Sequence, residues 1–406
     1  MGFNDYFNGD KNIAKCNVQD GENMGAEVKK VGRNMNIEIL RVFSLFLIFF
    51  CHYLSYNCYS EKSDSLLHIL LFWADKITGQ TGVCCFLLIT GYFMVDKSFK
   101  LDRVIKTDIQ VVIYSLLLCI SYYLLMFIQV LPTSIIPYWK GLPEVTTIFQ
   151  SVFPVWNSVY WFATAYIFLL FISPVLNILI SHLSARHHMM VILGLAAVSI
   201  WQLLSKFSAY WNNLLYAVII YMIGAWIRIY IDRIYVSRVG LKMSCVIGGA
   251  ALLLFLFSVE YVSDGFVAQW FKWSEHSMFG GVPVLPMAIA TCIFYAVVRR
   301  PSKPCGVRKL APLIAPAMFG VYLLHGNQIF DVVFWYVVSL CVPSVPGPAM
   351  IVINGVASIM LFVALTTLSL MINVAVVTPI TGLVMRSSLT QRASLIVDRV
   401  WNFDVR

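Results

Sequence analysis

The stretch from residue 33 to residue 55, RNMNIEILRVFSLFLIFFCHYLS, is apolar enough to cross a membrane, yet it carries three ionisable side chains. These are Glu38, Arg41 and His52. An ionisable group in hydrocarbon costs at least about 2.5 kcal/mol, so such groups usually face a protein interior or a wet cavity. On an α-helix, Arg41 and His52 lie roughly 20° apart in projection and about 16 Å apart along the axis. Glu38 lies about 40° from His52, so the three side chains form one stripe.

This stripe combines a cation that can hold an anionic ligand with an imidazole that can act on it. An imidazole changes protonation near neutral pH, and it can deprotonate an alcohol or accept an acyl group. We therefore expect His52 to be a base or nucleophile near the membrane midplane, and Glu38 to orient Arg41 at the membrane edge. The competing interpretation is that Arg41 is an anchor whose charge reaches the membrane surface and His52 a packed core histidine.

A second group of basic residues runs from residue 97 to residue 106, where Lys100, Arg103 and Lys106 follow one another at a spacing of three. At the start of a helix this spacing predicts a cationic ladder that can bind the phosphates of an acidic cytosolic ligand. The alternative is that these charges only set the membrane topology.

A third group is FGVYLLH, residues 319–325, in which Tyr322 and His325 share a helical face. His325 is expected about 20 Å into its span, close to the depth of His52, so the two histidines can line one cavity. Core packing of His325 is the alternative. Trp161 is the second residue of the run YWFATAYIFLLFISP, where an aromatic residue at the start of a span typically marks the membrane interface.

No metal site is expected from the sequence. His182, His187 and His188 have no carboxylate or cysteine beside them, which favours a solvated inner loop. The 10 cysteines lie mostly in apolar runs and form no C-x-x-C pair. Nucleophile-elbow, Walker, H-E-x-x-H and haem-attachment motifs do not occur.

Composition predicts the elements that position these groups. The 406 residues are 60% hydrophobic and 12% charged, whereas a soluble domain is about a quarter charged. This indicates an all-α, polytopic membrane bundle. The formal charge of +9 does not indicate nucleic-acid binding, because the basic residues recur in short blocks between apolar runs and not among solvated aromatic residues.

Runs of about 20 apolar residues predict about ten membrane spans. They are residues 36–57, 75–96, 107–129, 159–181, 188–205, 213–232, 242–262, 282–298, 312–341 and 348–378. Residues 1–33 read as a disordered cytosolic tail, 131–158 as an outer loop with a short interfacial helix, and 379–406 as a cytosolic C-terminal tail. Of the 29 Lys and Arg residues, all but Lys62, Lys76, Lys140, Lys206 and Lys272 fall on one side, so both termini are expected to be cytoplasmic.

Taken together, residues 34–378 resemble the acyltransferase 3 family of membrane acyltransferases, which O-acetylate cell-surface polysaccharides and related glycans. The most specific match is Arg41, ten residues and His52 in the first span. The segment GVCCFLLITGYFMV resembles the family's block ending in Ser-Gly-Tyr, with Thr90 in place of the serine. Further matches are the basic ladder, Trp161-Phe162, Pro174, and Tyr322-Leu323-Leu324-His325.

The resemblance implies an O-acyltransferase of the bacterial plasma (inner) membrane. Its donor would be acetyl-CoA or another acyl-CoA from the cytosol, and its acceptor a hydroxyl of a glycan or lipid-linked precursor, with no further cofactor. Lys100, Arg103, Lys106, Trp161, Tyr322 and His325 would contribute to substrate binding. Two features depart from the family pattern. No Glu follows Trp161, and no C-terminal hydrolase-like domain is expected, so transfer is expected to finish in the membrane part or on a partner.

Two other classes of function stay open. A transporter or flippase for glycan intermediates would also bury polar residues in about ten spans. It is expected to show discontinuous helices with Gly/Pro breaks in paired positions, and the sequence shows no such pair. A non-catalytic membrane partner of glycan assembly would not require His52.

Overall fold

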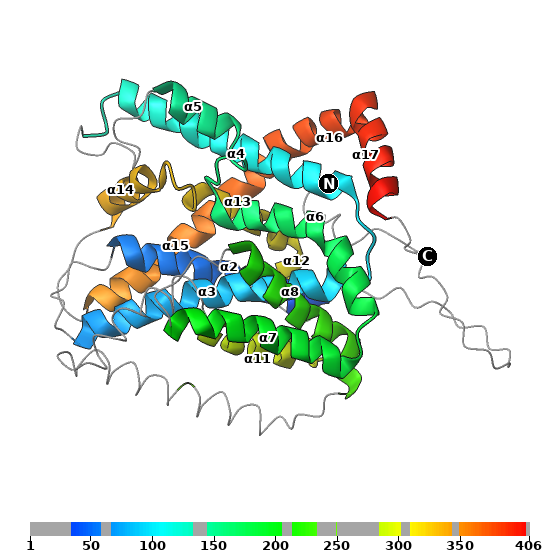
Figure 1. The fold of residues 1–406 in the computed structure, drawn as a ribbon. Coiled ribbons are helices and arrows are strands. Elements are labelled where there is room, and N and C mark those ends of the chain that lie inside the picture. The colour runs from blue at the N-terminus through cyan, green and yellow to red at the C-terminus, as the bar shows by residue number, and fades with distance from the viewer. Residues whose placement is uncertain are drawn as a thin grey trace.

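The computed structural model describes residues 34–57, 66–132, 144–204, 213–233, 249, 284–301, 309–342 and 349–402 (Figure 1). Within these ranges the chain is helical and contains no β-strand. The expected seventh span, residues 242–262, lies outside the described residues apart from residue 249. The expected N-terminal tail, residues 1–33, also lies outside them.

Six helices in the described ranges are long and apolar enough to cross a membrane, so the chain is a multi-pass, all-helical membrane protein. They are α2 (Met35–Asn57), α3 (Leu66–Met94), α4 (Leu101–Phe127), α6 (Trp161–Ser181), α8 (Asn213–Tyr230) and α15 (Ala349–Ile372), which continues into α16 (Thr378–Arg386). Shorter apolar stretches lie in α7 (Ala185–Leu204), over Ala185–Val198, and in α11 (Val284–Val298), α13 (Met318–His325) and α14 (Asp331–Cys341). The count of ten spans and the side of the termini remain predictions.

Helix α3 forms the centre of the bundle and packs against α2, α8 and α11. Glycines permit this approach. A Cβ atom at Gly82 would meet the backbone oxygen of Ser44 in α2, and one at Gly91 would meet the backbone oxygen of Tyr221 in α8. In lipid, apolar surface alone gives helices little reason to associate, so close packing through small residues holds them together. The glycines thus fix α3 between α2 and α8.

The segments expected on the cytosolic side meet at one end of the bundle. The Asn36 side chain, at the start of α2, donates a hydrogen bond of 3.0 Å to the carbonyl of Arg300, just beyond α11. Arg228, near the end of α8, pairs at 3.0 Å with Asp96, just beyond α3. This grouping matches the distribution of basic residues in the sequence.

The expected C-terminal tail is helical over most of its length. Helix α17 (Ser388–Trp401) turns away from α16 and packs crosswise at the start of α4 (Figure 1). The Asp398 carboxylate accepts a hydrogen bond of 2.7 Å from the backbone N–H of Leu101, and the Ser394 hydroxyl donates one of 2.7 Å to Asp102. Because the first N–H groups of a helix have no partner inside it, Asp398 caps α4 from a distant part of the chain.

The expectation of one continuous span over residues 312–341 is wrong. The segment consists of α12 (Ala311–Ile314), the 3₁₀ turn Ala315–Ala317 and α13, and a non-helical connection then leads to α14. The break follows from Gly326-Asn327. The Asn327 side-chain oxygen accepts hydrogen bonds from the N–H groups of Ile329 (2.9 Å) and Phe330 (3.2 Å), as a helix cap does. The outer segment does contain a short helix, α5 (Glu144–Val152), as expected.

Candidate active site

The ionisable stripe of α2 begins with a buried ion pair. One guanidinium nitrogen of Arg41 lies 2.8 and 3.0 Å from the two carboxylate oxygens of Glu38, and each residue is only 3% exposed. Arg41 is therefore enclosed by protein, and its expected position at the membrane edge stays a prediction. The nearby carboxylate offsets the cost of burying the positive charge.

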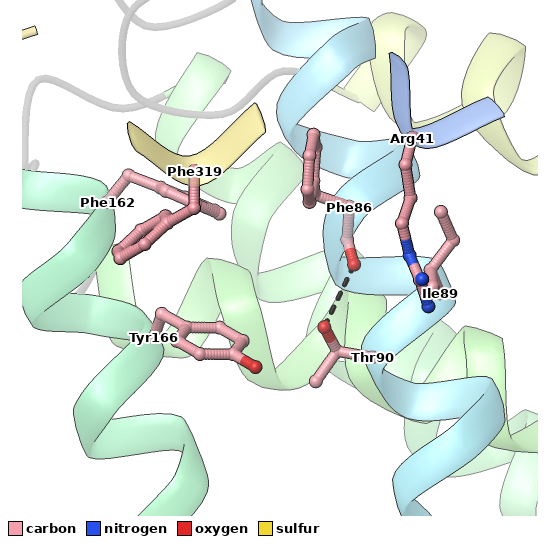
Figure 2. Close-up of a pocket in the computed structure, with 7 residues that line it drawn as sticks. All are labelled: Arg41, Phe86, Ile89, Thr90, Phe162, Tyr166 and Phe319. Carbon is pink, nitrogen blue, oxygen red and sulfur yellow. Dashed lines mark hydrogen bonds between the residues drawn. The ribbon is translucent and has the colours of Figure 1, made fainter. Parts of the chain in front are cut away.

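Arg41 lines a narrow pocket between four helices (Figure 2). Arg41 comes from α2, Thr90 from α3, Tyr166 from α6 and Phe319 from α13, and the remaining lining residues are Phe86, Ile89 and Phe162. The pocket has room for roughly one water molecule. The Thr90 hydroxyl donates a hydrogen bond of 2.9 Å to the carbonyl of Phe86, one turn earlier in α3.

Tyr166 is a residue of this pocket that the sequence argument missed. Its hydroxyl is within electrostatic reach of both Arg103 and Arg41, although these come from α4 and α2. Its only sequence signal was its place in an aromatic-rich span next to Trp161. The Tyr166 phenol is thus influenced by two arginines, of which Arg41 lines the pocket.

The two histidines singled out from different spans come together. The ring centroids of His52 and His325 are 5.1 Å apart, with the planes at 67°. His325 is 1% exposed, and His52 is partly buried. The similar depth inferred for them from the sequence therefore corresponds to a direct neighbour relation in space.

Hydrogen bonding fixes the tautomer of His325. Its Nδ1 lies 2.6 Å from the carbonyl of Val321, one turn earlier. A carbonyl oxygen only accepts hydrogen bonds, so Nδ1 must carry the proton and Nε2 must present a lone pair in the neutral ring. Nε2 is buried and has no hydrogen-bond partner among the described residues. This is an imidazole nitrogen available to accept a proton.

A buried carboxylate on α3 supports His52. Asp75 is 3% exposed and accepts hydrogen bonds from Ser55 (2.8 Å) and from the thiol of Cys51 (3.1 Å), two residues that flank His52 on α2. It also interacts electrostatically with His52. Asp75 was not among the site residues predicted from the sequence, although an acidic residue beside an apolar run could have marked it as a candidate. Its charge would stabilise an imidazolium at His52, as the carboxylate of a catalytic triad does.

The two ends of the stripe lie on either side of the middle of α2. The helix runs from Met35 to Asn57, so its midpoint falls between Arg41 and His52. At 1.5 Å per residue, each side chain begins about 8 Å from that midpoint, on opposite sides. The stripe therefore straddles the middle of the helix, and the expected position of His52 near the membrane midplane stays a prediction.

Aromatic contacts connect the arginine pocket with the histidines. The ring of Phe162 lies 5.5 Å from that of Tyr322, edge to face, and the Tyr322 ring lies 6.2 Å from that of His325. Tyr322 is buried, and its hydroxyl has no hydrogen-bond partner in the described part of the chain. Tyr322 is thus placed between the pocket and the histidines.

The other expected binding residues lie apart from this pair. Lys100 and Lys106 are partly buried near the start of α4, and Arg103 between them is buried, with its guanidinium 3.0 Å from the carbonyl of Ser98. The three do not form one open ladder, because Arg103 turns inward. Trp161 is partly buried at the first position of α6, and its neighbour Phe162 lines the pocket instead.

Metal ligation has no support within the described residues, where no three His, Cys, Asp or Glu side chains cluster. The expectation that His182, His187 and His188 share a solvated loop holds only in part. His182 and His187 are exposed, whereas His188 is fully buried with its ring 6.2 Å from that of Tyr230. The reason is that α7 already begins at Ala185.

Comparison with known proteins gives one match. The family model described as an acyltransferase domain, Acyl_transf_3, covers residues 34–378. No curated protein and no solved structure matches the chain. The matched region contains the Glu38–Arg41 pair, the arginine pocket and the two histidines, and it takes up most of the sequence. The chain therefore belongs to the acyltransferase 3 family.

Proposed function

We propose that this membrane acyltransferase moves an acyl group, acetyl in the simplest case, from cytosolic acyl-CoA to a hydroxyl of a cell-surface glycan or its lipid-linked precursor. We place it in the bacterial plasma membrane. The observation that carries the proposal is the contact between His52 and His325 inside the bundle, with Arg41 about 16 Å away on the same stripe of α2. A cation and an imidazole at that separation suit a long anionic donor.

The donor is held by charge in this proposal. CoA is polyanionic, so Lys100 and Lys106 would attract its phosphates at the end of the bundle where α4 starts. Arg41 and Arg103, which both act on Tyr166, provide fixed positive charge farther in. The thioester arm would then extend past Phe162 and Tyr322 toward the histidines.

The transfer step needs a base. The acceptor oxygen attacks the thioester carbonyl carbon, a C–O bond forms and the C–S bond breaks. His52 takes the hydroxyl proton and returns it to the departing thiolate. In a second route, His52 itself accepts the acyl group and then passes it to the acceptor. Asp75 would stabilise the imidazolium in either route, while His325, through its available Nε2, would relay the proton or hold the acceptor hydroxyl.

A transporter or flippase is the second candidate, and one observation favours it. The segment 311–341 is discontinuous, with a break after His325, and broken helices line the substrate sites of many transporters. In the acyltransferase proposal the same break places His325 beside His52. Consumption of the thioester separates the two candidates, because a transporter leaves acyl-CoA intact.

The test is release of CoA from acetyl-CoA in membrane vesicles that retain the cell's own glycan. We expect release with the wild-type chain, none with His52→Ala, and unchanged release with His187→Ala, which removes an exposed histidine on α7 as a matched control. Equal release by His52→Ala and wild type at equal membrane levels would refute the site. No release by the wild type would refute the function.

A further inference from the structure

An aromatic pair lies beyond the histidines, on the side away from Arg41. Tyr56, near the end of α2, stacks on Trp335 of α14, with ring centroids 5.4 Å apart and planes at 7°. Trp335 is 2% exposed, whereas Tyr56 is 44% exposed. Because Trp335 covers one face of the Tyr56 ring, the exposed surface belongs to the other face and the edge. The pair thus presents a flat, rigidly supported apolar surface.

Polar groups adjoin this surface. The Tyr56 hydroxyl donates a hydrogen bond of 2.8 Å to Oδ2 of Asp331, the first residue of α14. Oδ1 of Asp331 accepts one of 2.7 Å from the N–H of Val332. The indole N–H of Trp335 is buried and has no hydrogen-bond partner within the described ranges. A carboxylate is therefore fixed at the edge of the aromatic surface.

The surface is connected to the proposed reaction site. The Trp335 ring lies 6.3 Å from the ring of His325, which in turn lies 5.1 Å from the ring of His52. A group resting on the free face of Tyr56 would therefore be separated from the two histidines by the stacked rings of Tyr56 and Trp335, whose centroids are 5.4 Å apart. This is the side from which an acceptor could approach while the donor arm comes from Arg41.

We propose that Tyr56, Trp335 and Asp331 form a binding platform for an uncharged sugar ring of the acceptor, an inference that rests on the proposed function. A pyranose has an apolar C–H face that packs on an aromatic ring, and its hydroxyls can donate hydrogen bonds to a carboxylate. The negative charge of Asp331 disfavours an anionic sugar at the same place. The platform thus selects a neutral ring of the acceptor on the side of the histidines away from Arg41.

Binding can be measured without acyl transfer. Saturation-transfer NMR on the full-length protein in nanodiscs would use cellohexaose, maltohexaose and chitohexaose, with hexagalacturonate as the anionic comparison. We expect at least one neutral saccharide to bind through its ring C–H protons, and Tyr56→Ala to weaken that binding about tenfold. Tyr56→Phe, which keeps the ring, should bind within about twofold of wild type. Trp156→Ala, which removes a side chain that is 85% exposed elsewhere, should leave binding unchanged.

Asp331→Asn keeps the shape of the side chain and provides a second variant should Tyr56→Ala fold poorly. It should weaken binding of the neutral saccharide and improve that of hexagalacturonate. The platform is refuted if no neutral saccharide binds, if Tyr56→Ala binds as wild type does, or if hexagalacturonate binds wild type as tightly as the neutral oligomers.

The outcome is separable from that of the proposed function. His52→Ala should bind saccharide normally while releasing no CoA. Saccharide binding that depends on Tyr56, without CoA release by the wild type, would overturn the acyltransferase proposal and leave the platform standing. CoA release that depends on His52, with binding indifferent to Tyr56→Ala, would overturn the platform alone.

Discussion

Glu38→Gln would leave the guanidinium of Arg41 buried without its counter-charge. The two side chains are each about 3% exposed, and one Arg41 nitrogen contacts both carboxylate oxygens at 2.8 and 3.0 Å. Removing one partner of such a pair costs about 3–5 kcal/mol, because the remaining charge stays desolvated. The contact of Arg41 with the ring of Phe93, at 5.9 Å, contributes about 2 kcal/mol at a desolvated site and does not replace the carboxylate.

The double variant Glu38→Leu/Arg41→Leu separates folding from function. Replacing both charges of a buried pair by apolar groups is often neutral or stabilising. We therefore expect Glu38→Gln and Arg41→Leu each to lower the thermal stability of the purified protein, and the double variant to recover most of the loss. CoA release should be lost in the double variant as well, because the donor still lacks the cation that lines the pocket.

The assay combines size-exclusion-detected thermal unfolding in detergent with CoA release in vesicles. A double variant that is stable and fully active would show that Arg41 serves only the fold. Single variants as stable as wild type would contradict the burial of an uncompensated charge. The first result would remove Arg41 from the proposed donor path.

Three further predictions follow from named contacts. Gly82→Ala should destabilise the protein by about 1–3 kcal/mol, because the added Cβ meets the backbone of α2. Gly194→Ala, with open space around it, should be neutral. Equal melting temperatures of the two variants would contradict the glycine packing. Asp75→Asn should reduce CoA release at least about tenfold at unchanged expression, and full activity would exclude it as a positioning residue for His52. Lys100→Ala/Lys106→Ala should raise the KM for acyl-CoA at low salt with kcat unchanged, and the difference should fade at high salt; an unchanged KM would refute phosphate steering.

Much of the membrane architecture followed from hydropathy and charge. The first span expected at residues 36–57 is α2, which covers residues 35–57, and the segments expected to be cytosolic meet at one end of the bundle. These features depend on runs of many residues, so single side chains hardly alter them. The break after His325 escaped notice because it depends on two residues, Gly326 and Asn327, inside a long apolar run. The apolar run predicted a continuous helix there, although a Gly-Asn pair is typical of a helix end.

Within the site, too, the sequence predicted the features of single helices but not the contacts between helices. Helical periodicity placed Glu38, Arg41 and His52 on one face, and the equal depths of two spans pointed to His325. Periodicity along one helix says nothing about which residue of another helix faces it. For that reason Asp75 and Tyr166, which reach the stripe from α3 and α6, emerged only from the three-dimensional arrangement.

Mass spectrometry of the surface glycan is the most direct test that this protein acylates the glycan and that the reaction depends on His52. Cells lacking the protein would be complemented with wild type, His52→Ala or His187→Ala at equal membrane levels. We predict glycan heavier by ester-linked acyl groups, removable with mild base, in cells with wild type and His187→Ala, and unmodified glycan in cells with His52→Ala. Identical glycan masses in all three strains, or full acylation with His52→Ala, would contradict the account.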